Sequence, residues 1–302
     1  MHAAKVATGL PRLAVVLLII IGLGWGSNWP AMKIALQDIP PWTFRLMCVF
    51  LGGIALLALT RLSGERLSIP PGKLPVLALV SLLNVTGWQM FSAFGLLRIG
   101  SGRAAIIAFT MPLWASMLGA LFLGERPAVQ QLLALALGLV ALVLLLGQDV
   151  TAVGASPVGG LFMLGAALSW AAGTVIVKRT GWGGMPVTAM TGWQLLLGGV
   201  PILIGWALLE PLPDFAAYSG LAWFCLAYTV AVGMVLATAS FFKLVTLVPA
   251  GVAATGTLAV PVVGVISSAI VLGERIGLAE VIALALVVSG LFLLVWGGER
   301  RV

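Results

Sequence analysis

The chain has 302 residues, of which 61% are hydrophobic and only 8% are charged, and its formal net charge is +7. A soluble domain normally carries about a quarter charged residues, so this composition excludes a water-soluble globular protein. The apolar runs are continuous over about 20 residues, whereas barrel strands would alternate over about 10. We therefore predict an all-α integral membrane protein.

Charged residues, prolines and glycines divide the chain into ten predicted transmembrane helices. They lie near residues 13–36, 41–62, 74–97, 102–123, 128–147, 157–178, 186–209, 219–243, 250–272 and 277–297. The longest gap, 148–156, is interpreted as a linker between a first five-helix repeat, 1–147, and a second, 157–302.

The first predicted helix ends in an unusually polar stretch, GWGSNWPAMK at 24–33. Its Trp25, Asn28, Trp29 and Met32 follow a 0, 3, 4, 7 spacing and share one helical face. An asparagine that faces lipid is costly, so this face is expected to line the bundle interior or a wet cavity.

Later helices repeat this combination of aromatic and polar residues. The third has Asn84, Trp88 and Phe91 beside Gln89, the fourth has Thr110, Met111 and Trp114, and the sixth has Trp170 and Thr174. Together they predict a central pocket for a small amphipathic solute. The predicted substrate-binding residues are Trp25, Asn28, Asn84, Trp88, Gln89, Met111, Trp170, Thr174 and Lys33. An interfacial aromatic belt is favoured for four tryptophans near span ends, Trp29, Trp42, Trp182 and Trp296.

Several cations near span ends allow two interpretations. Lys33 and Lys178 occupy equivalent places in the first helix of each half, and each either extends to the headgroups or attracts a solute carboxylate at the cavity mouth. The same two interpretations apply to Lys243 and Arg45.

An internal repeat is the most informative feature of the chain. The segment 103–126, RAAIIAFTMPLWASMLGALFLGER, aligns with 252–275, VAATGTLAVPVVGVISSAIVLGER, at a shift of 149. The first and sixth helices align at a shift of 145, which matches Trp25 to Trp170. Because each copy holds an odd number of spans, the second copy must enter the membrane from the opposite side. Inverted repeats of this kind are typical of secondary transporters that work by alternating access.

The aligned prolines, Pro112 and Pro261, are predicted to kink their helices or act as hinges, as is Pro30. The paired LGER segments at 123–126 and 272–275 are interpreted as turns. Their glutamates, Glu125 and Glu274, are expected near the positive N-terminal end of the next helix.

The basic residues predict the orientation, because Lys and Arg are retained on the cytoplasmic side. With the N-terminus inside, 11 of the 16 basic residues fall on the cytoplasmic side: Lys5, Arg12, Arg61, Arg66, Lys73, Arg126, Lys178, Arg179, Lys243, Arg300 and Arg301. The other 5 are Lys33, Arg45, Arg98, Arg103 and Arg275. Both termini are thus predicted to be cytoplasmic, and the net charge gives no reason to expect nucleic acid as a partner.

Several functions are disfavoured by what the sequence lacks. All nine acidic residues fall in loops or near span ends and the single histidine is His2, so a proton relay through the membrane is disfavoured. No cluster suits a metal, and no nucleophile–base pair or phosphate loop is present, so we expect neither an enzyme nor a cofactor.

The helix 1 sequence GWGSNWPAMKIAL, the "MP" and "VP" pairs, the two LGER turns and the five-helix duplication resemble the drug/metabolite transporter superfamily, EamA type. More narrowly, the chain is similar to YddG-like bacterial amino-acid exporters. The resemblance implies a ten-helix basket around a central cavity in the inner membrane. The family pattern is carried by Trp25, Asn28, Pro30, Lys33, Pro112, Glu125, Pro261 and Glu274. The second half departs from it, because SWAAGTVIVK lacks the asparagine and proline of helix 1.

The leading hypothesis is a secondary transporter that exports aromatic or neutral amino acids, or related small metabolites. Its expected partners are the solute and membrane lipid. One alternative is uptake or antiport of another small metabolite. A second, from a different class, is a membrane scaffold or sensor that transports nothing.

Overall fold

A computed structural model describes residues 12–123, 129–151, 157–247 and 259–299. Every regular element among them is helical. The first half contains α1 (Arg12–Gly26), α2 (Asn28–Asp38), α3 (Pro41–Leu62), α4 (Leu74–Ser81), the π-helix η1 (Leu82–Gly87), α5 (Trp88–Leu96), α6 (Ser101–Ala108), α7 (Met111–Leu123) and α8 (Val129–Thr151). The second half contains α9 (Pro157–Arg179), α10 (Val187–Leu209), α11 (Gly220–Tyr228), the π-helix η2 (Thr229–Leu236), α12 (Ala237–Leu247), α14 (Ala259–Leu272) and α15 (Leu278–Glu299).

Seven helices within the described residues are long and apolar enough to cross a membrane: Arg12–Asp38, Pro41–Leu62, Leu74–Leu96, Ser101–Phe122, Pro157–Arg179, Val187–Leu209 and Gly220–Leu244. Three shorter apolar helices cover Leu132–Leu145, Ala259–Leu272 and Leu278–Leu293. The chain is thus an all-helical multi-pass membrane protein, since backbone groups in lipid need internal partners. Most ends lie within a few residues of the predicted ones. However, α8 continues to Thr151, into the predicted linker 148–156. The start of the predicted span 250–272 lies outside the described residues.

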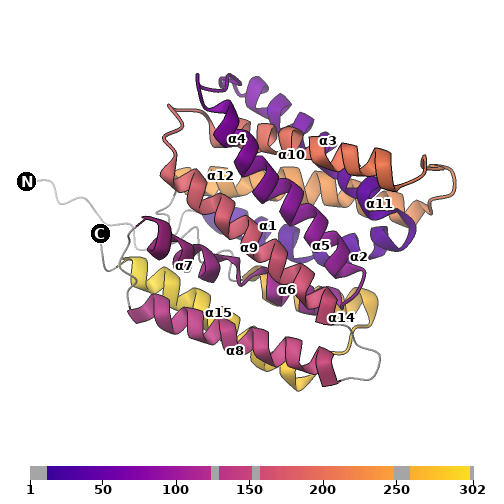
Figure 1. The fold of residues 1–302 in the computed structure, drawn as a ribbon, viewed down its shortest axis with the longest axis vertical. Helices are drawn as coiled ribbons and strands as arrows, with labels where there is room; N and C mark the ends of the chain where they lie inside the picture. The colour runs from indigo at the N-terminus through magenta and orange to yellow at the C-terminus, as the bar shows by residue number, and fades with distance from the viewer. Residues whose placement is uncertain (1–11, 124–128, 152–156, 248–258, 300–302) are drawn as a thin grey trace, which may run out of the picture.

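Helices from corresponding places in the two halves pack in pairs. The α3 helix lies against α10, and α8 lies against α15. Figure 1 shows the α3–α10 pair at one end of the long axis of the molecule and the α8–α15 pair at the other. Between them, α1 and α2 contact α11, α12 and α14, while α5 and η1 contact α9.

One face of the bundle gathers several polar contacts and is called the Glu274 face below. On it the α2–α3 connection meets the end of α10 and the start of α11, through Glu210 and Asp38. The end of α5 and the start of α6 lie there too, next to Lys33 and Glu274. The Glu274 face is therefore formed by both halves.

Candidate functional site

Four of the membrane-crossing helices lose regular α-helical geometry near their middles. The first breaks at Ser27 between α1 and α2, and the fourth breaks at 109–110 between α6 and α7. The other two contain η1 and η2. At the repeat shift of 149, η1 corresponds to 231–236, which lies within η2. Wide π turns inside α-helices occur frequently at functional sites, so η1 and η2 indicate where the candidate site lies.

Three tryptophans meet among these breaks and are called the tryptophan cluster. Trp29 of α2 lies edge-on to Trp88 of α5, with ring centroids 6.5 Å apart. Trp88 in turn lies 5.2 Å from Trp170 of α9. Trp29 is only 3% exposed, whereas the other two are half-buried. The structure therefore unites the predicted residues Trp88 and Trp170, and it corrects the interfacial assignment of Trp29.

Two asparagine side chains of the first half pack directly against glycines of the second half. A Cβ atom on Gly173 of α9 would lie 1.9 Å from Oδ1 of Asn84, and one on Gly233 of η2 would lie 2.9 Å from Cγ of Asn28. By the repeat shifts, Asn28 corresponds to Gly173 and Asn84 to Gly233. The same helix contact is thus built twice, with the asparagine and the glycine exchanged. Sequence analysis missed both glycines, although the repeat alignment contains the signal.

The two asparagine side chains leave hydrogen-bonding capacity unused. Nδ2 of Asn84 donates to Oε1 of Gln194 at 3.3 Å, but its Oδ1 has no partner among the described residues. Oδ1 of Asn28 is also buried without one. Since an unpaired buried acceptor costs about 1–3 kcal/mol, each of these oxygens is a place where a hydrogen-bond donor would stabilise the protein.

The other predicted binding residues have different surroundings. Nε1 of Trp25 donates to the carbonyl of Gly233 at 2.9 Å, and its ring contacts Phe241. Gln89 is buried, and Met111 packs half-buried against the main core with Trp88. Thr174 is exposed, and its hydroxyl donates to the carbonyl of Trp170 in its own helix. Thr174 therefore does not join the buried polar residues of the predicted pocket, such as Asn84 and Gln89.

Lys33 belongs to the Glu274 face. Its Nζ donates to the carbonyls of Leu96 and Ile99, the second at 2.8 Å. These carbonyls are at the C-terminal end of α5, where the negative end of the helix dipole favours a cation. Lys33 thus caps the C-terminal end of α5 within the bundle and does not extend to the headgroups.

Two of the three predicted hinge prolines lie where a helical segment begins. Pro30 is in the first turn of α2 and Pro112 in the first turn of α7, while Pro261 lies in α14, two residues after the described part of that helix starts. A first turn tolerates the missing N–H, because no intrahelical acceptor serves that position. For Pro30 and Pro112 the break in the helix comes just before the proline. Whether any of them moves remains a prediction.

Glu274 joins the two halves at the Glu274 face. Its carboxylate accepts from the backbone N–H groups of Ser101 at 2.6 Å and Gly102 at 3.0 Å, and from the Ser101 hydroxyl at 2.9 Å. The Ser101 hydroxyl oxygen also lies 2.8 Å from Oγ of Ser268, and Arg103 pairs with Glu280. These residues, Ser101, Gly102, Arg103, Ser268, Glu274 and Glu280, are called the Glu274 cluster.

The position of Glu274 corrects one prediction. Its carboxylate was expected at the start of the following helix, but it caps α6 in the other half, and Glu280 accepts from Gly277 at the start of α15. Either helix start attracts a carboxylate, so the local sequence did not distinguish them. Glu125 of the first LGER turn lies outside the described residues.

The family model of EamA-like transporters matches this chain twice, at residues 12–147 and at residues 157–296. The chain belongs to the EamA-like transporter family. It is therefore a membrane transporter of small molecules and not an enzyme, and its transporter domain comprises two repeats.

Curated relatives match nearly the whole of this EamA-like transporter. The uncharacterized transporter YvbV of Bacillus subtilis (strain 168) is 30% identical over 94% of this chain and 92% of its own. A probable amino-acid metabolite efflux pump of Escherichia coli (strain K12) is 24% identical over 95% and 96%. The uncharacterized inner membrane transporter YedA of the same strain is 28% identical over 90% and 87%. A crystal structure with 20% identity and a TM-score of 0.68, covering 95% of this chain and 98% of that chain, shares the fold.

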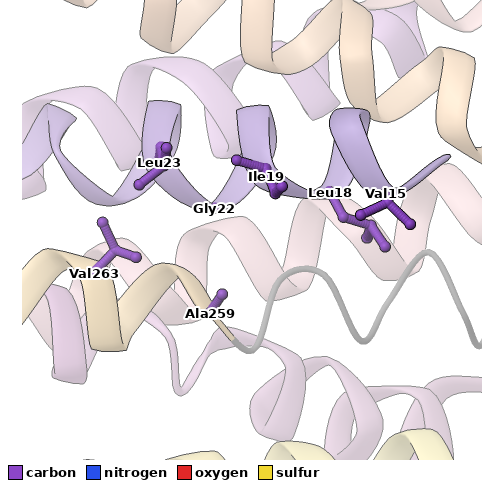
Figure 2. A pocket seen from close by; sticks show the side chains of 7 residues that line it. All are labelled: Val15, Leu18, Ile19, Gly22, Leu23, Ala259 and Val263. Atoms are coloured by element: carbon purple, nitrogen blue, oxygen red, sulfur yellow. The ribbon is translucent and has the colours of Figure 1, made fainter. Parts of the chain in front are cut away.

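This EamA-like transporter also has a groove between α1 and α14, shown in Figure 2. Its volume is about 380 Å³, and its lining consists of Val15, Leu18, Ile19, Gly22, Leu23, Ala259 and Val263. The described lining residues have no polar side chain, so this part of the groove suits hydrocarbon better than a polar solute. None of the predicted binding residues lines this groove, so it is separate from the tryptophan cluster.

Proposed function

We propose that this transporter exports aromatic or neutral amino acids, or related small metabolites, across the bacterial inner membrane by alternating access. The tryptophan cluster carries the proposal. Trp29 and Trp88 come from the first half and Trp170 from the second, so an aromatic solute bound among them would contact both halves. The unpaired oxygens of Asn28 and Asn84 are further acceptors that an N–H group of a solute would satisfy.

The architecture proposed for this function is ten transmembrane helices in two inverted repeats, 1–147 and 157–302, joined at 148–156. The seven long apolar helices and the three shorter ones support that number. The packing of α3 on α10 and of α8 on α15 supports a twofold relation between the halves. The exchanged asparagine–glycine contacts support it further, because only related interfaces would repeat such a contact.

The Glu274 cluster supports a closed state of the Glu274 face. It joins the start of α6 to α14 and α15 through hydrogen bonds and an ion pair that water would have to replace when this face opens. In alternating access, one face closes while the other admits the solute. We infer that the structure represents a state closed at the Glu274 face.

The name of one relative, a probable amino-acid metabolite efflux pump, supports amino-acid export, and the name of YedA supports the inner membrane. Uptake or antiport of another small metabolite is the alternative within the family. The decisive experiment is counterflow of labelled amino acids in proteoliposomes that contain the purified protein. Exchange of phenylalanine or tryptophan is expected. A lack of exchange across a broad solute panel would refute amino-acid transport.

Two substitutions test the site itself. Trp88→Ala removes the ring that links Trp29 to Trp170, and Asn28→Ala removes one unpaired amide. Each is expected to reduce amino-acid counterflow about tenfold, because an aromatic contact or hydrogen bond is worth roughly 1–1.5 kcal/mol. The yield of folded protein should not change. Trp193→Ala is the control, since Trp193 donates to the carbonyl of Leu67 away from the cluster. Normal counterflow in both site variants would reject the assignment.

The inverted arrangement also predicts the location of both termini. With 11 of 16 basic residues inside, the N- and C-termini should both be cytoplasmic. Fusions of a reporter that fluoresces only in the cytoplasm should be bright at either terminus, while a fusion truncated after Leu209 should be dark. Opposite signals from the two termini would rule out an even number of spans.

A further inference from the structure

Arg45 is the most deeply buried cation among the described residues. It lies in the second turn of α3, and its side chain is 1% exposed. Its Nη2 donates to Oγ of Ser92 at 2.9 Å, and its Nη1 reaches only the thioether sulfur of Met32 at 3.3 Å. The guanidinium lies over the ring of Phe44, 5.2 Å from the centroid. Nε is buried and has no hydrogen-bond partner in the described part of the chain.

No carboxylate among the described residues pairs with this guanidinium. The neighbouring charge on α2 is the cation of Lys33, next to Met32. Glu274 acts electrostatically on Lys33, but its oxygens are already occupied by Ser101 and Gly102. Burying a charge without an opposite charge costs several kcal/mol of desolvation free energy, so a bound anion would stabilise this position.

The two groups that hold Arg45 belong to the helices that carry the tryptophan cluster. Ser92 lies four residues after Trp88 on α5, and Met32 lies three residues after Trp29 on α2. Side chains at these spacings share a helical face. The groups that hold the guanidinium therefore lie about one helical turn beyond the Trp29–Trp88 contact, toward the Glu274 face.

We propose that Arg45 binds the carboxylate of the transported solute. The inference rests on the proposed function and deepens it, because it assigns the carboxylate of the solute to Arg45 while the aromatic or apolar group of the solute lies on the tryptophan cluster. A guanidinium binds a carboxylate through two parallel N–H bonds. In Arg45 the Nε–H is unused, and Nη2, which points the same way as Nε–H, carries two N–H groups of which Ser92 accepts one. The selected solutes carry one carboxylate a few bonds from an aromatic or apolar group.

A purely structural role for Arg45 would predict that replacing it lowers the stability of the protein and the transport of every solute alike. If Arg45 serves the solute, the empty protein bears the desolvation cost of an unpaired buried charge, and an apolar side chain of similar size removes that cost. Arg45→Met places such a side chain between Met32 and Phe44. We expect this variant to fold at least as well as the wild type and yet to lose its preference for carboxylates.

The test compares three probes in proteoliposomes and in thermal unfolding: L-phenylalanine, L-phenylalaninamide and 3-phenylpropionate. The amide lacks the carboxylate, and 3-phenylpropionate lacks the ammonium group. We expect the wild type to prefer phenylalanine over the amide at least tenfold in counterflow. Arg45→Met should reduce the counterflow of phenylalanine to the level of the amide and leave the counterflow of the amide unchanged. Arg98→Met is the matched control, since Arg98 is an exposed cation at the end of α5.

Arg45→Lys is the second variant. It keeps the charge but loses the planar fork, so it should retain only part of the preference. If both Arg45 variants keep the full wild-type preference for phenylalanine over its amide, the inference is overturned. It is also overturned if neither phenylalanine nor 3-phenylpropionate gives counterflow or thermal stabilisation with the wild type. Equal transport of phenylalanine and its amide by the wild type also overturns it while leaving amino-acid export intact. Arg45-dependent stabilisation by 3-phenylpropionate without any response to phenylalanine would support the carboxylate site and reject amino acids as the solutes.

Discussion

Replacing Glu274 by alanine is expected to open the Glu274 face of the transporter. The carboxylate caps the start of α6 through three hydrogen bonds and holds it against the α14–α15 connection. Loss of a helix cap costs about 0.5–2 kcal/mol, which shifts a two-state equilibrium up to about thirtyfold toward the open state. The α6–α14 contact that buries Ser101 and Ser268 should then separate.

A cysteine at position 268 reports this opening. The native Cys48 and Cys225 are buried and can be replaced by alanine to give a silent background. Ser268 is 0% exposed, so Ser268→Cys should react slowly with a membrane-impermeant maleimide, and about tenfold faster or more after Glu274→Ala.

Glu210→Ala is the control for this experiment. Glu210 caps α3 by accepting from the N–H groups of Trp42 and Thr43 at 2.9 and 2.8 Å, but it does not join α6 to α14. It should lower thermal stability by a comparable amount without exposing position 268. Equal labelling rates with and without Glu274 would show that the cluster does not control this face.

Replacing Gly198 by alanine is expected to be strongly destabilising. A Cβ atom there would lie 2.6 Å from the carbonyl oxygen of Ser81 and 2.5 Å from Cβ of Val85. Both atoms belong to the segment formed by the end of α4 and η1, so relief requires the backbone to move. Overpacking of this kind costs about 1–3 kcal/mol. Because η1 also positions Asn84, we expect solute binding to weaken with stability.

Thermal unfolding in detergent measures this effect. Gly220→Ala is the matched control, since it also introduces one methyl group in a predicted span and would meet no atom within 4 Å. Gly198→Ala should unfold several degrees below the wild type and Gly220→Ala close to it. Identical midpoints would mean that α10 and η1 do not approach as closely as described.

Much of the fold could be predicted because its signals are local or repeated. The apolar spans follow from hydropathy alone, and most predicted ends agree with the helices within a few residues. Trp88 and Trp170 could be placed at one site because each lies beside polar residues in an apolar helix, where lipid would penalise the polar group.

The contacts within the site were less predictable. Phe91 was placed on the same face as Asn84 and Trp88, yet it is 39% exposed and packs beside Phe162. The π-helix η1 lies between Ser81 and Trp88, and its wider turns change the rotation of the helix without a recognisable local sequence signal. Trp29 was assigned to the interface because the sequence shows how near it lies to the span end. The sequence does not show its contact with Trp88 of α5.

The sequence by itself determined that this protein crosses a membrane with helices and that its second half repeats the first, since both properties depend on composition and on order along the chain. Only the tertiary structure decided which groups face one another. It brought Asn84 onto Gly173, Glu274 onto α6, and Arg45 beside Met32 and Ser92. These contacts depend on how each helix is rotated and where it breaks, and that is set by packing between segments far apart in the chain.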